Sequence, residues 1–454
     1  MHPATTEPAR ARRSLALLAG VIACVGSGFD AAAQTTATMP GAHRADDRAS
    51  RRPAPPPATD TTLALVSASA GGQVARGLVC GVSADGSKVL FSSDSSNLIS
   101  GDTQFTQDLF LKDLNGNGVT RVVRNTQFCL ALTPDANTVV YTLENPSNFP
   151  AIRVRNLSTG VETVVTPPTS TFPNVRGYEF AGVSDDGLRV AFIAQPTGTC
   201  SGYSCSALGP ARMLMRDLAT GQLVNLENQV RLTTTQGRAA GNARLSPDGQ
   251  ALAFSTYALY PELGDNDTRS DVFSLNLATG ALQWVNTDGA GNRVGPTGFS
   301  GGGPAFGVQD FLGNNGKVAF FSSFDTNFGA AGIYVKDLAN GALTRVFGAQ
   351  ASVAEYRASV SLSDDLRKAA YVVRTPGSTQ TSVQSPAVID LATGAMLNAA
   401  TLTDGTVGNG KTTVTVLLSR DGRAAVFDNN STNLIGGPPR GGGAEQRAYR
   451  KLLP

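Results

Sequence analysis

The sequence predicts an all-β fold, a seven-bladed β-propeller of four-stranded antiparallel blades, and three observations support it. Apolar residues alternate with polar ones and are interrupted by Gly, Asn and Asp, as in half-buried strands joined by turns. A turn-and-strand signal recurs seven times, about 50 to 67 residues apart. A second strand–turn–strand element follows each of the first six copies, so one repeat supplies the four strands of a propeller blade.

The first element of the repeat is a polar residue, then Asp or Asn and usually Gly, before an apolar strand. Examples are "SADGSKVLF" (Ser83–Phe91) and "SPDGQALAF" (Ser246–Phe254). A tight turn between two apolar strands predicts a hairpin, which supplies strands a and b of each blade. The turn residues that define the seven copies are Asp85, Asp135, Asp186, Asp248, Asn315, Asp365 and Asp421.

The second element predicts another hairpin, strands c and d, as in "MLMRDLATGQLVNL" (Met213–Leu226). The seventh copy ends with "AYRKLLP" (Ala448–Pro454), a third strand without a fourth. We expect an N-terminal strand, "TTLALVSAS" (Thr61–Ser69), to complete this last blade, because the pairing removes an exposed sheet edge. Residues 61–454 are thus expected to form one propeller.

The first residues predict export. Three arginines precede the apolar run "SLALLAGVIACV" (Ser14–Val25), and "AAAQ" (Ala31–Gln34) supplies small residues for signal-peptidase cleavage. We therefore expect residues 1–33 to be a signal peptide. In the alternative, "VIAC" (Val21–Cys24) resembles a bacterial lipobox, residues 1–23 are removed and Cys24 carries a lipid anchor. The expected location is periplasmic, outer-membrane lipoprotein or secreted, and no later apolar run is long enough to span a bilayer.

Residues 34–60 are rich in Pro, Ala and Thr and lack apolar periodicity, which predicts a disordered tether. Four cysteines follow it, and an even number in an oxidising compartment favours disulfides. Cys200 and Cys205 close a short loop and are expected to form one bridge, which leaves Cys80 and Cys129 for the second. In the alternative, Cys80 and Cys129 are buried free thiols.

Charge and histidine content exclude several function classes. Net charge is only +2 and charged residues make up 16%, which gives no support to nucleic-acid binding. The only histidines, His2 and His43, precede the repeats. The repeat region therefore cannot hold a Ser-His-Asp or Cys-His apparatus, or a zinc or manganese site with histidine ligands such as those of propeller lyases.

Carboxylates remain as candidates for chemistry, and two repeats place them in the same register. Asp102 and Asp108 follow the end of strand b in the first repeat by 11 and 17 residues, and Asp265 and Asp271 do so in the fourth. With Asp267 they could supply oxygen ligands to calcium. In the alternative, the aspartates before strand c hydrogen-bond the loop backbone. A pair of glycosidase carboxylates is a third interpretation.

The loops between strands b and c, and between one blade and the next, differ in every repeat, whereas the other turns are alike. We expect any functional surface on this variable face, because rigid scaffolds present binding residues on variable loops. Tyr178, Arg244 and Arg357, on expected inner strands, are the ligand-face candidates. Trp284 ends a strand and is interpreted as packing.

The pattern "S-P-D-G-x-x-[apolar]-A-F … D-[VL]-[FY]-x-x-D-L-x-T-G" resembles the TolB-like (WD-like) β-propeller repeats of exported bacterial proteins, roughly over Thr61–Pro454. The resemblance implies a periplasmic or cell-surface location and a role in protein or glycan binding. The leading hypothesis is an exported, non-enzymatic and monomeric binding or scaffold propeller for an envelope or extracellular protein, or a glycan. The alternatives are a calcium-supported carbohydrate-active hydrolase or lyase that uses carboxylates, and a structural calcium-stabilised surface module.

Overall fold

All the residues described below belong to one compact unit, Pro53–Ser300 with Pro304–Pro454, of a computed structural model. The expected signal peptide, Cys24 and all of the tether except Asp60 lie outside the described residues. The described residues are 60–103, 106–144, 150–172, 175–196, 198–201, 204–207, 212–226, 229, 241–256, 259–266, 271–293, 306–312, 316–322, 332–348, 360–374, 384–412, 415–435 and 445–454.

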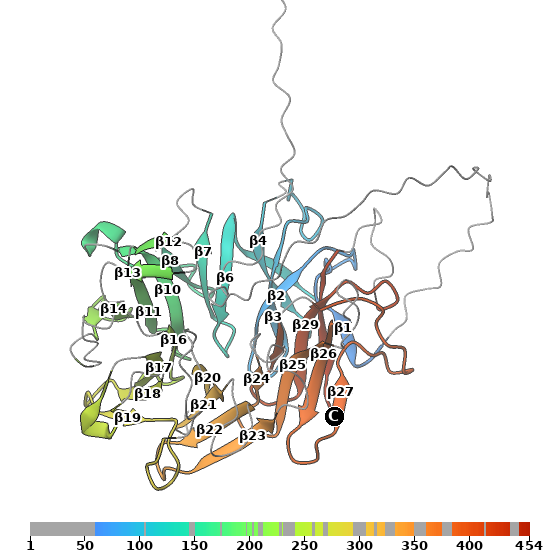
Figure 1. The fold of residues 1–454 in the computed structure, drawn as a ribbon. Coiled ribbons are helices and arrows are strands. Elements are labelled where there is room, and N and C mark those ends of the chain that lie inside the picture. Colours follow the sequence, from blue (N-terminus) through green and yellow to red (C-terminus); the bar gives the residue numbers. More distant parts are fainter. Residues whose placement is uncertain are drawn as a thin grey trace, which may run out of the picture. The chain divides into compact units, whose positions relative to one another are not determined.

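The fold is the predicted seven-bladed propeller, in which each blade is a four-stranded antiparallel sheet. The sheets follow one another along the chain (Figure 1). Blade one consists of β2 (Leu78–Val82), β3 (Lys88–Ser93), β4 (Asp108–Asp113) and β5 (Val119–Val123). Blade two consists of β6 (Thr126–Leu132), β7 (Thr138–Leu143), β8 (Ile152–Asn156) and β9 (Glu162–Val164). Blade three consists of β10 (Val175–Val183), β11 (Arg189–Pro196), β14 (Arg212–Asp217) and β15 (Leu223–Asn225).

The remaining blades repeat this order, and the first strand of each is the inner strand a. Blades four to seven are β16 (Gly241–Leu245), β17 (Ala251–Thr256), β18 (Asp271–Asn276) and β19 (Leu282–Trp284); β20 (Phe306–Leu312), β21 (Lys317–Ser322), β22 (Gly332–Asp337) and β23 (Leu343–Gly348); β24 (Ser361–Leu362), β25 (Lys368–Arg374), β26 (Gln384–Asp390) and β27 (Met396–Asn398); and β28 (Val416–Leu418), β29 (Ala424–Asn429), β30 (Arg447–Leu452) and β1 (Leu63–Leu65).

The N-terminal strand closes the ring as predicted. β1 pairs antiparallel with β30, with Leu63 opposite Lys451 and Leu65 opposite Tyr449. Figure 1 shows this blue strand beside the red strands of the last blade. The strand is shorter than the predicted Thr61–Ser69, because the chain turns into a small hairpin in which Ala68 bridges Val74.

In six of the seven blades, the a–b turn is braced by the polar residue that opens the repeat. In blade one the buried Ser83 hydroxyl donates to Asp85 Oδ1 at 2.6 Å and accepts the backbone N–H of Lys88 at 2.9 Å. The next residue, Gly86, has a φ of +71°, a conformation that glycine adopts without strain. The same hydroxyl–carboxylate bond recurs in Thr133/Asp135, Ser184/Asp186, Ser246/Asp248, Ser363/Asp365 and Ser419/Asp421.

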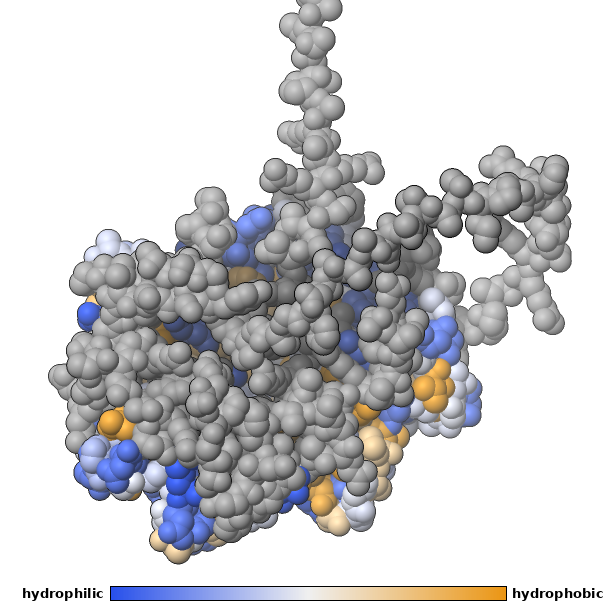
Figure 2. Space-filling view, in the orientation of Figure 1, coloured by the Kyte–Doolittle hydropathy of each residue, from blue (hydrophilic) through white to orange (hydrophobic). Residues whose placement is uncertain are grey.

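The core lies within and between the blades and is built from the repeated strand residues. Strands b and c carry facing aromatic rings, such as Phe91 and Phe110, whose centroids are 5.7 Å apart. The described surface seen in Figure 2 is mostly hydrophilic, with hydrophobic residues in small separate patches. The repeated phenylalanines thus build the scaffold rather than a surface.

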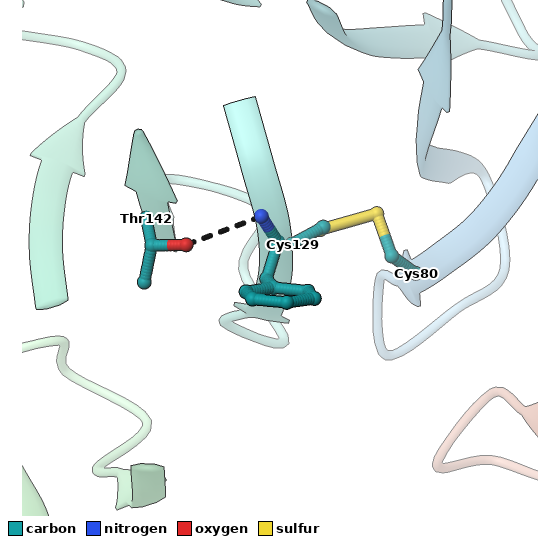
Figure 3. The surroundings of a disulfide bond; sticks show 4 residues. Cys80, Cys129 and Thr142 are labelled. Atoms are coloured by element: carbon teal, nitrogen blue, oxygen red, sulfur yellow. Dashed lines mark hydrogen bonds between the residues drawn. A yellow bond between two sulfur atoms is a disulfide. The ribbon is translucent and has the colours of Figure 1, made fainter. Parts of the chain in front are cut away.

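A disulfide joins Cys80 of β2 to Cys129 of β6 and thereby connects blades one and two (Figure 3). This is the pairing that the cysteine count predicts. Their Cα atoms are 6.0 Å apart, within the usual range for a disulfide. The other predicted pair lies in an additional hairpin, β12 (Gly198–Ser201) and β13 (Ser204–Ala207), whose backbone register places Cys200 opposite Cys205. Their side chains lie outside the described part of the chain.

Candidate functional site

The two faces of the propeller differ in how they are built. The a–b turns interlock on the face that we call the turn face. The N–H of Ala84 donates to the carbonyl of Pro134 at 2.8 Å, which links blade one to blade two, and that of Asp185 donates to Pro247 at 2.7 Å. The N–H of Asp364 similarly donates to the carbonyl of Arg420 at 3.0 Å. The b–c loops and the connections between blades form the opposite face, the loop face.

An ion pair crosses the turn face. The Arg420 guanidinium of blade seven donates two hydrogen bonds to the Asp185 carboxylate of blade three, at 2.5 and 2.6 Å. Blades three and seven are not neighbours in the ring, so the pair spans the propeller axis. Each side chain is about a third exposed, at 33% and 30%. The pair therefore links opposite sides of the ring at the turn-face end of the axis.

In blade one, the two predicted aspartates converge on an arginine. Arg121, on β5, lies 2.9 Å from Asp102 and 3.3 Å from Asp108, and both carboxylates are buried. Asp108 Oδ1 also accepts the backbone N–H of Asn125 at 3.0 Å. With Arg124, these side chains line a hollow of only about 40 Å³. The Asp108 contacts are those of the loop-bracing interpretation.

In blade four, the equivalent Asp271 is fully buried at the start of β18. Its Oδ1 accepts hydrogen bonds from Asn286 Nδ2 at 2.6 Å and from Arg293 Nε at 2.8 Å, whereas its buried Oδ2 has no hydrogen-bond partner among the described residues. Burial raises the pKa of Asp271 to about 6, and the charge of Asp265 adds to this, although Arg293 opposes it. Asp265 is itself buried and accepts the N–H of Tyr260 at 3.3 Å.

The structure thus gives the aspartate at the start of strand c a guanidinium partner in both blades. Asp267, the third carboxylate of the blade-four hypothesis, lies outside the described residues. Within the described part of the chain, no three His, Cys, Asp or Glu side chains come together in a group that could hold a metal ion. The calcium site stays a prediction.

Two of the three ligand-face candidates lie in the described part of the chain. Tyr178, on β10, packs edge-on against Phe192 with centroids 5.5 Å apart and donates to the carbonyl of Pro168 at 3.3 Å. Burial raises the pKa of Tyr178. Arg244, on β16, donates to the carbonyl of its neighbour Ala243 at 2.9 Å. Arg357 lies outside the described residues. Tyr178 therefore packs within blade three.

Sequence reasoning missed three buried lysines that hold hairpins of the loop face. Each hairpin follows the last strand of a blade, and each lysine is the fifth residue of strand c in the next blade. Lys336 is 3% exposed, and its ammonium donates to the carbonyls of Thr287 and Gly341, both at 2.8 Å. Burial lowers the pKa of all three lysines. The equivalent contacts are Lys112 to Ala68 and Lys451 to Thr401.

The strand position of these lysines is a signal that the sequence contains, in "LFLKDL", "IYVKDL" and "AYRKLL". A lysine there predicts an exposed residue on a strand that ends in a polar turn. The structure buries it instead, because the hairpin of the preceding blade folds over it. At these three blade boundaries, a hairpin of one blade is therefore held by a lysine of the next.

No protein-family model matches the chain, and no curated protein matches it in sequence. Solved structures of the same fold do match. An oligogalacturonate lyase in complex with manganese is 14% identical, with a TM-score of 0.51, over 88% of this chain and 95% of that one. An oligogalacturonate lyase from Vibrio parahaemolyticus is 11% identical, with a TM-score of 0.53, over 84% of this chain and 90% of that one.

TolB from Acinetobacter baumannii is a more distant structural match, 16% identical, with a TM-score of 0.36, over 77% of each chain. At these identities the likenesses show the fold alone. The class that the structure defines is therefore the all-β, seven-bladed propeller, and its structural neighbours include both TolB and enzymes. No helix among the described residues is both long and apolar enough to cross a bilayer.

Proposed function

We propose that the protein is an exported, non-enzymatic binding propeller of the TolB-like kind, whose loop face holds a protein or glycan partner. The observation that carries the proposal is the contrast between the two faces. The turn face is locked by repeated turns and is crossed by the Arg420–Asp185 pair. The loop face consists of connections that differ in every blade and are held from the neighbouring blade, the arrangement in which scaffolds present binding residues.

Export is supported by the N-terminal sequence features, and the periplasm, the outer membrane with a lipid on Cys24, and secretion are the locations that they allow. The Cys80–Cys129 disulfide agrees with an oxidising compartment. The absence of histidine from the repeats supports a binding role, because the common nucleophilic and metal-hydrolytic sites need it.

The test compares exposed aliphatic residues on the two faces. Val407 lies on a loop-face hairpin and is 52% exposed, Leu259 lies in the b–c loop of blade four, and Leu188 lies at an a–b turn and is 44% exposed. Partners would be captured from envelope extracts by crosslinking and quantified by mass spectrometry. We expect Val407→Asp or Leu259→Asp to reduce capture about tenfold, the loss of roughly 1.4 kcal/mol, and Leu188→Asp to leave it unchanged. Loss of capture only with Leu188→Asp would contradict the proposal.

A second candidate, a calcium-stabilised surface module, is favoured by the partnerless Oδ2 of Asp271. An oxygen ligand without a hydrogen bond could accept a hard cation, with Asp265 close enough to raise its pKa. Calcium titration followed by thermal unfolding, with and without a chelator, tests this role. A melting temperature that calcium does not raise would exclude it.

A further inference from the structure

A pocket of about 310 Å³ lies at the boundary of blades four and five, and none of the residues considered above as catalytic or metal-binding lines it. Its apolar wall consists of Trp284 and Leu282 of β19 together with Leu263. Its polar rim includes Asp288, in the hairpin that follows β19, and Lys336 of β22, together with Gln283 and Thr287. The volume is at the lower end of the roughly 300–1,000 Å³ of small-molecule sites, which suits a single ring.

The Trp284 side chain in the apolar wall is held in place by contacts with Phe273 and Asn286. Phe273, across the sheet from Trp284, stacks on the indole with centroids 6.1 Å apart and planes 21° apart. The indole Nε1 donates to Asn286 Oδ1 at 3.0 Å, which sets the tilt of the ring. Leu263 ends the short helix η3 (Pro261–Leu263) in the b–c loop. The interpretation of Trp284 as packing therefore accounts for its contact with Phe273, while the side chain also remains part of the pocket wall.

The polar rim offers a carboxylate rather than a cation. Asp288 is partly exposed; its Oδ1 accepts the N–H groups of Ala290 and Asn292 at 2.9 and 2.8 Å, and its Oδ2 accepts one bond from Asn292 Nδ2 at 3.0 Å. These bonds, that from the Asn292 side chain first, hold the pKa of Asp288 below its usual range. The ammonium of Lys336 is engaged with backbone carbonyls, including that of Thr287 at 2.8 Å. An ionised carboxylate accepts hydrogen bonds from hydroxyl groups and repels an anionic ligand.

The two sister hairpins lack this wall, so the pocket is not a consequence of the repeat. The strand register places Trp284 opposite Phe273 in blade four. The corresponding residue is Asn398 in blade six and Leu65 in blade seven. Only blade four therefore combines the hairpin with an aromatic wall among the three blades whose hairpins are described.

We propose that this pocket binds one pyranose ring of a neutral glycan. A pyranose has an apolar face of C–H groups, which fits an indole and two leucines, and a rim of hydroxyl donors, which fits the Asp288 carboxylate. The partly exposed Asp288 carboxylate disfavours an acidic sugar. The inference rests on the proposed binding function and narrows the partner from protein or glycan to glycan.

Trp284 is the only tryptophan in the chain, so its fluorescence reports on this pocket directly. The purified full chain is titrated with cellotriose and maltotriose as neutral probes and with a galacturonate trimer as the acidic probe. We expect a saturable change in emission with at least one neutral trisaccharide, and binding of the galacturonate trimer about tenfold weaker or absent. Saturation-transfer NMR on the same samples detects binding that leaves the emission unchanged.

The matched variants are Asp288→Asn and Asp404→Asn, because Asp404 braces the sister hairpin of blade six through its bond from Thr406 N–H at 2.9 Å. Asp288→Asn is expected to weaken neutral-sugar binding about tenfold, the typical effect of losing a charged hydrogen-bond acceptor, and Asp404→Asn to leave it unchanged. Absence of both a fluorescence and an NMR response, preference for the acidic trimer, or equal effects of the two variants would overturn the proposal. These outcomes do not depend on the capture experiment, so loop-face binding of a protein could persist when the sugar site fails.

Discussion

The strength of the Arg420–Asp185 ion pair, which links blades seven and three across the axis, can be tested quantitatively. Two parallel bonds at 2.5 and 2.6 Å join the side chains of two blades that do not touch in the ring. Hydrogen bonds to charged groups contribute roughly 1.5–3 kcal/mol each when buried, whereas exposed ion pairs contribute about 0.2–1 kcal/mol. Because the side chains are 33% and 30% exposed, we expect a coupling free energy of about 1–2 kcal/mol.

The assay is a double-mutant cycle in urea unfolding with Arg420→Met, Asp185→Asn and the double variant. In 1 M NaCl the screening length falls to about 3 Å, so the coupling free energy should decrease. The control cycle uses Arg76 and Asp94, a single-bonded pair at 2.9 Å with side chains 49% and 36% exposed, for which we expect less than about 0.5 kcal/mol. A coupling between Arg420 and Asp185 no larger than that of the control would refute the bridge across the axis.

Three further predictions concern the loop face and the blade boundaries. Lys336→Met should lower the free energy of unfolding by about 2–4 kcal/mol in urea, because it leaves buried carbonyls without a donor, and an unchanged midpoint would contradict this. The Cys80→Ser/Cys129→Ser variant should lose about 4 kcal/mol, since the bridge closes a loop with a sequence separation of 49; an equal midpoint with and without reductant in the wild type would argue against the bridge. The raised pKa of Asp271, about 6, means that the native state binds the proton more tightly than the unfolded chain, so its contribution to stability falls as pH rises from about 4 to 6. Relative to Asp271→Asn, the wild type should therefore lose about 3 kcal/mol between pH 4 and pH 7 in urea unfolding with chelator present, and parallel pH profiles would contradict the shift.

The repeat made the fold predictable because its signals are local. A hydroxyl, an aspartate and a glycine within four residues mark four of the seven a–b turns, as Ser83, Asp85 and Gly86 do, and the incomplete last copy predicted how the ring closes. The same turn forms in blades two and six although Ala136 and Leu366 stand in place of glycine, with φ of +56° and +58°, because the hydroxyl–Asp bond is kept. Local redundancy of this kind tolerates one missing signal.

The partners of the carboxylates were not predictable because they come from different positions in the two blades. The sequence predicts Asp108 and Asp271 just before strand c, and in the structure each is the first residue of that strand. Their guanidinium partners, however, are Arg121 on strand d in blade one and Arg293 in a hairpin beyond strand d in blade four. No spacing rule covers both. A calcium ion was inferred from the carboxylates alone, without these arginines.

One position of strand c shows how the loop face acquires both variability and rigidity. Its fifth residue is a lysine in blades one, five and seven, where it caps a hairpin carbonyl of the preceding blade. In blade three it is Arg216, whose Nε donates to the carbonyl of Val165 in blade two at 3.0 Å. In blade four it is Leu275, and in blade six the residue with the equivalent pairing is Ile389, the sixth of β26; both are aliphatic and pack in the core. In the hairpins that they hold, the cationic residues bond mainly to backbone carbonyls; the contact of Lys336 with the Thr287 hydroxyl, at 3.3 Å, is longer than its bond to the Thr287 carbonyl. The hairpin sequence can therefore change while its position is kept. A binding face needs this combination, and it explains how blade four could acquire Trp284 and a pocket on a hairpin that its sister blades also carry.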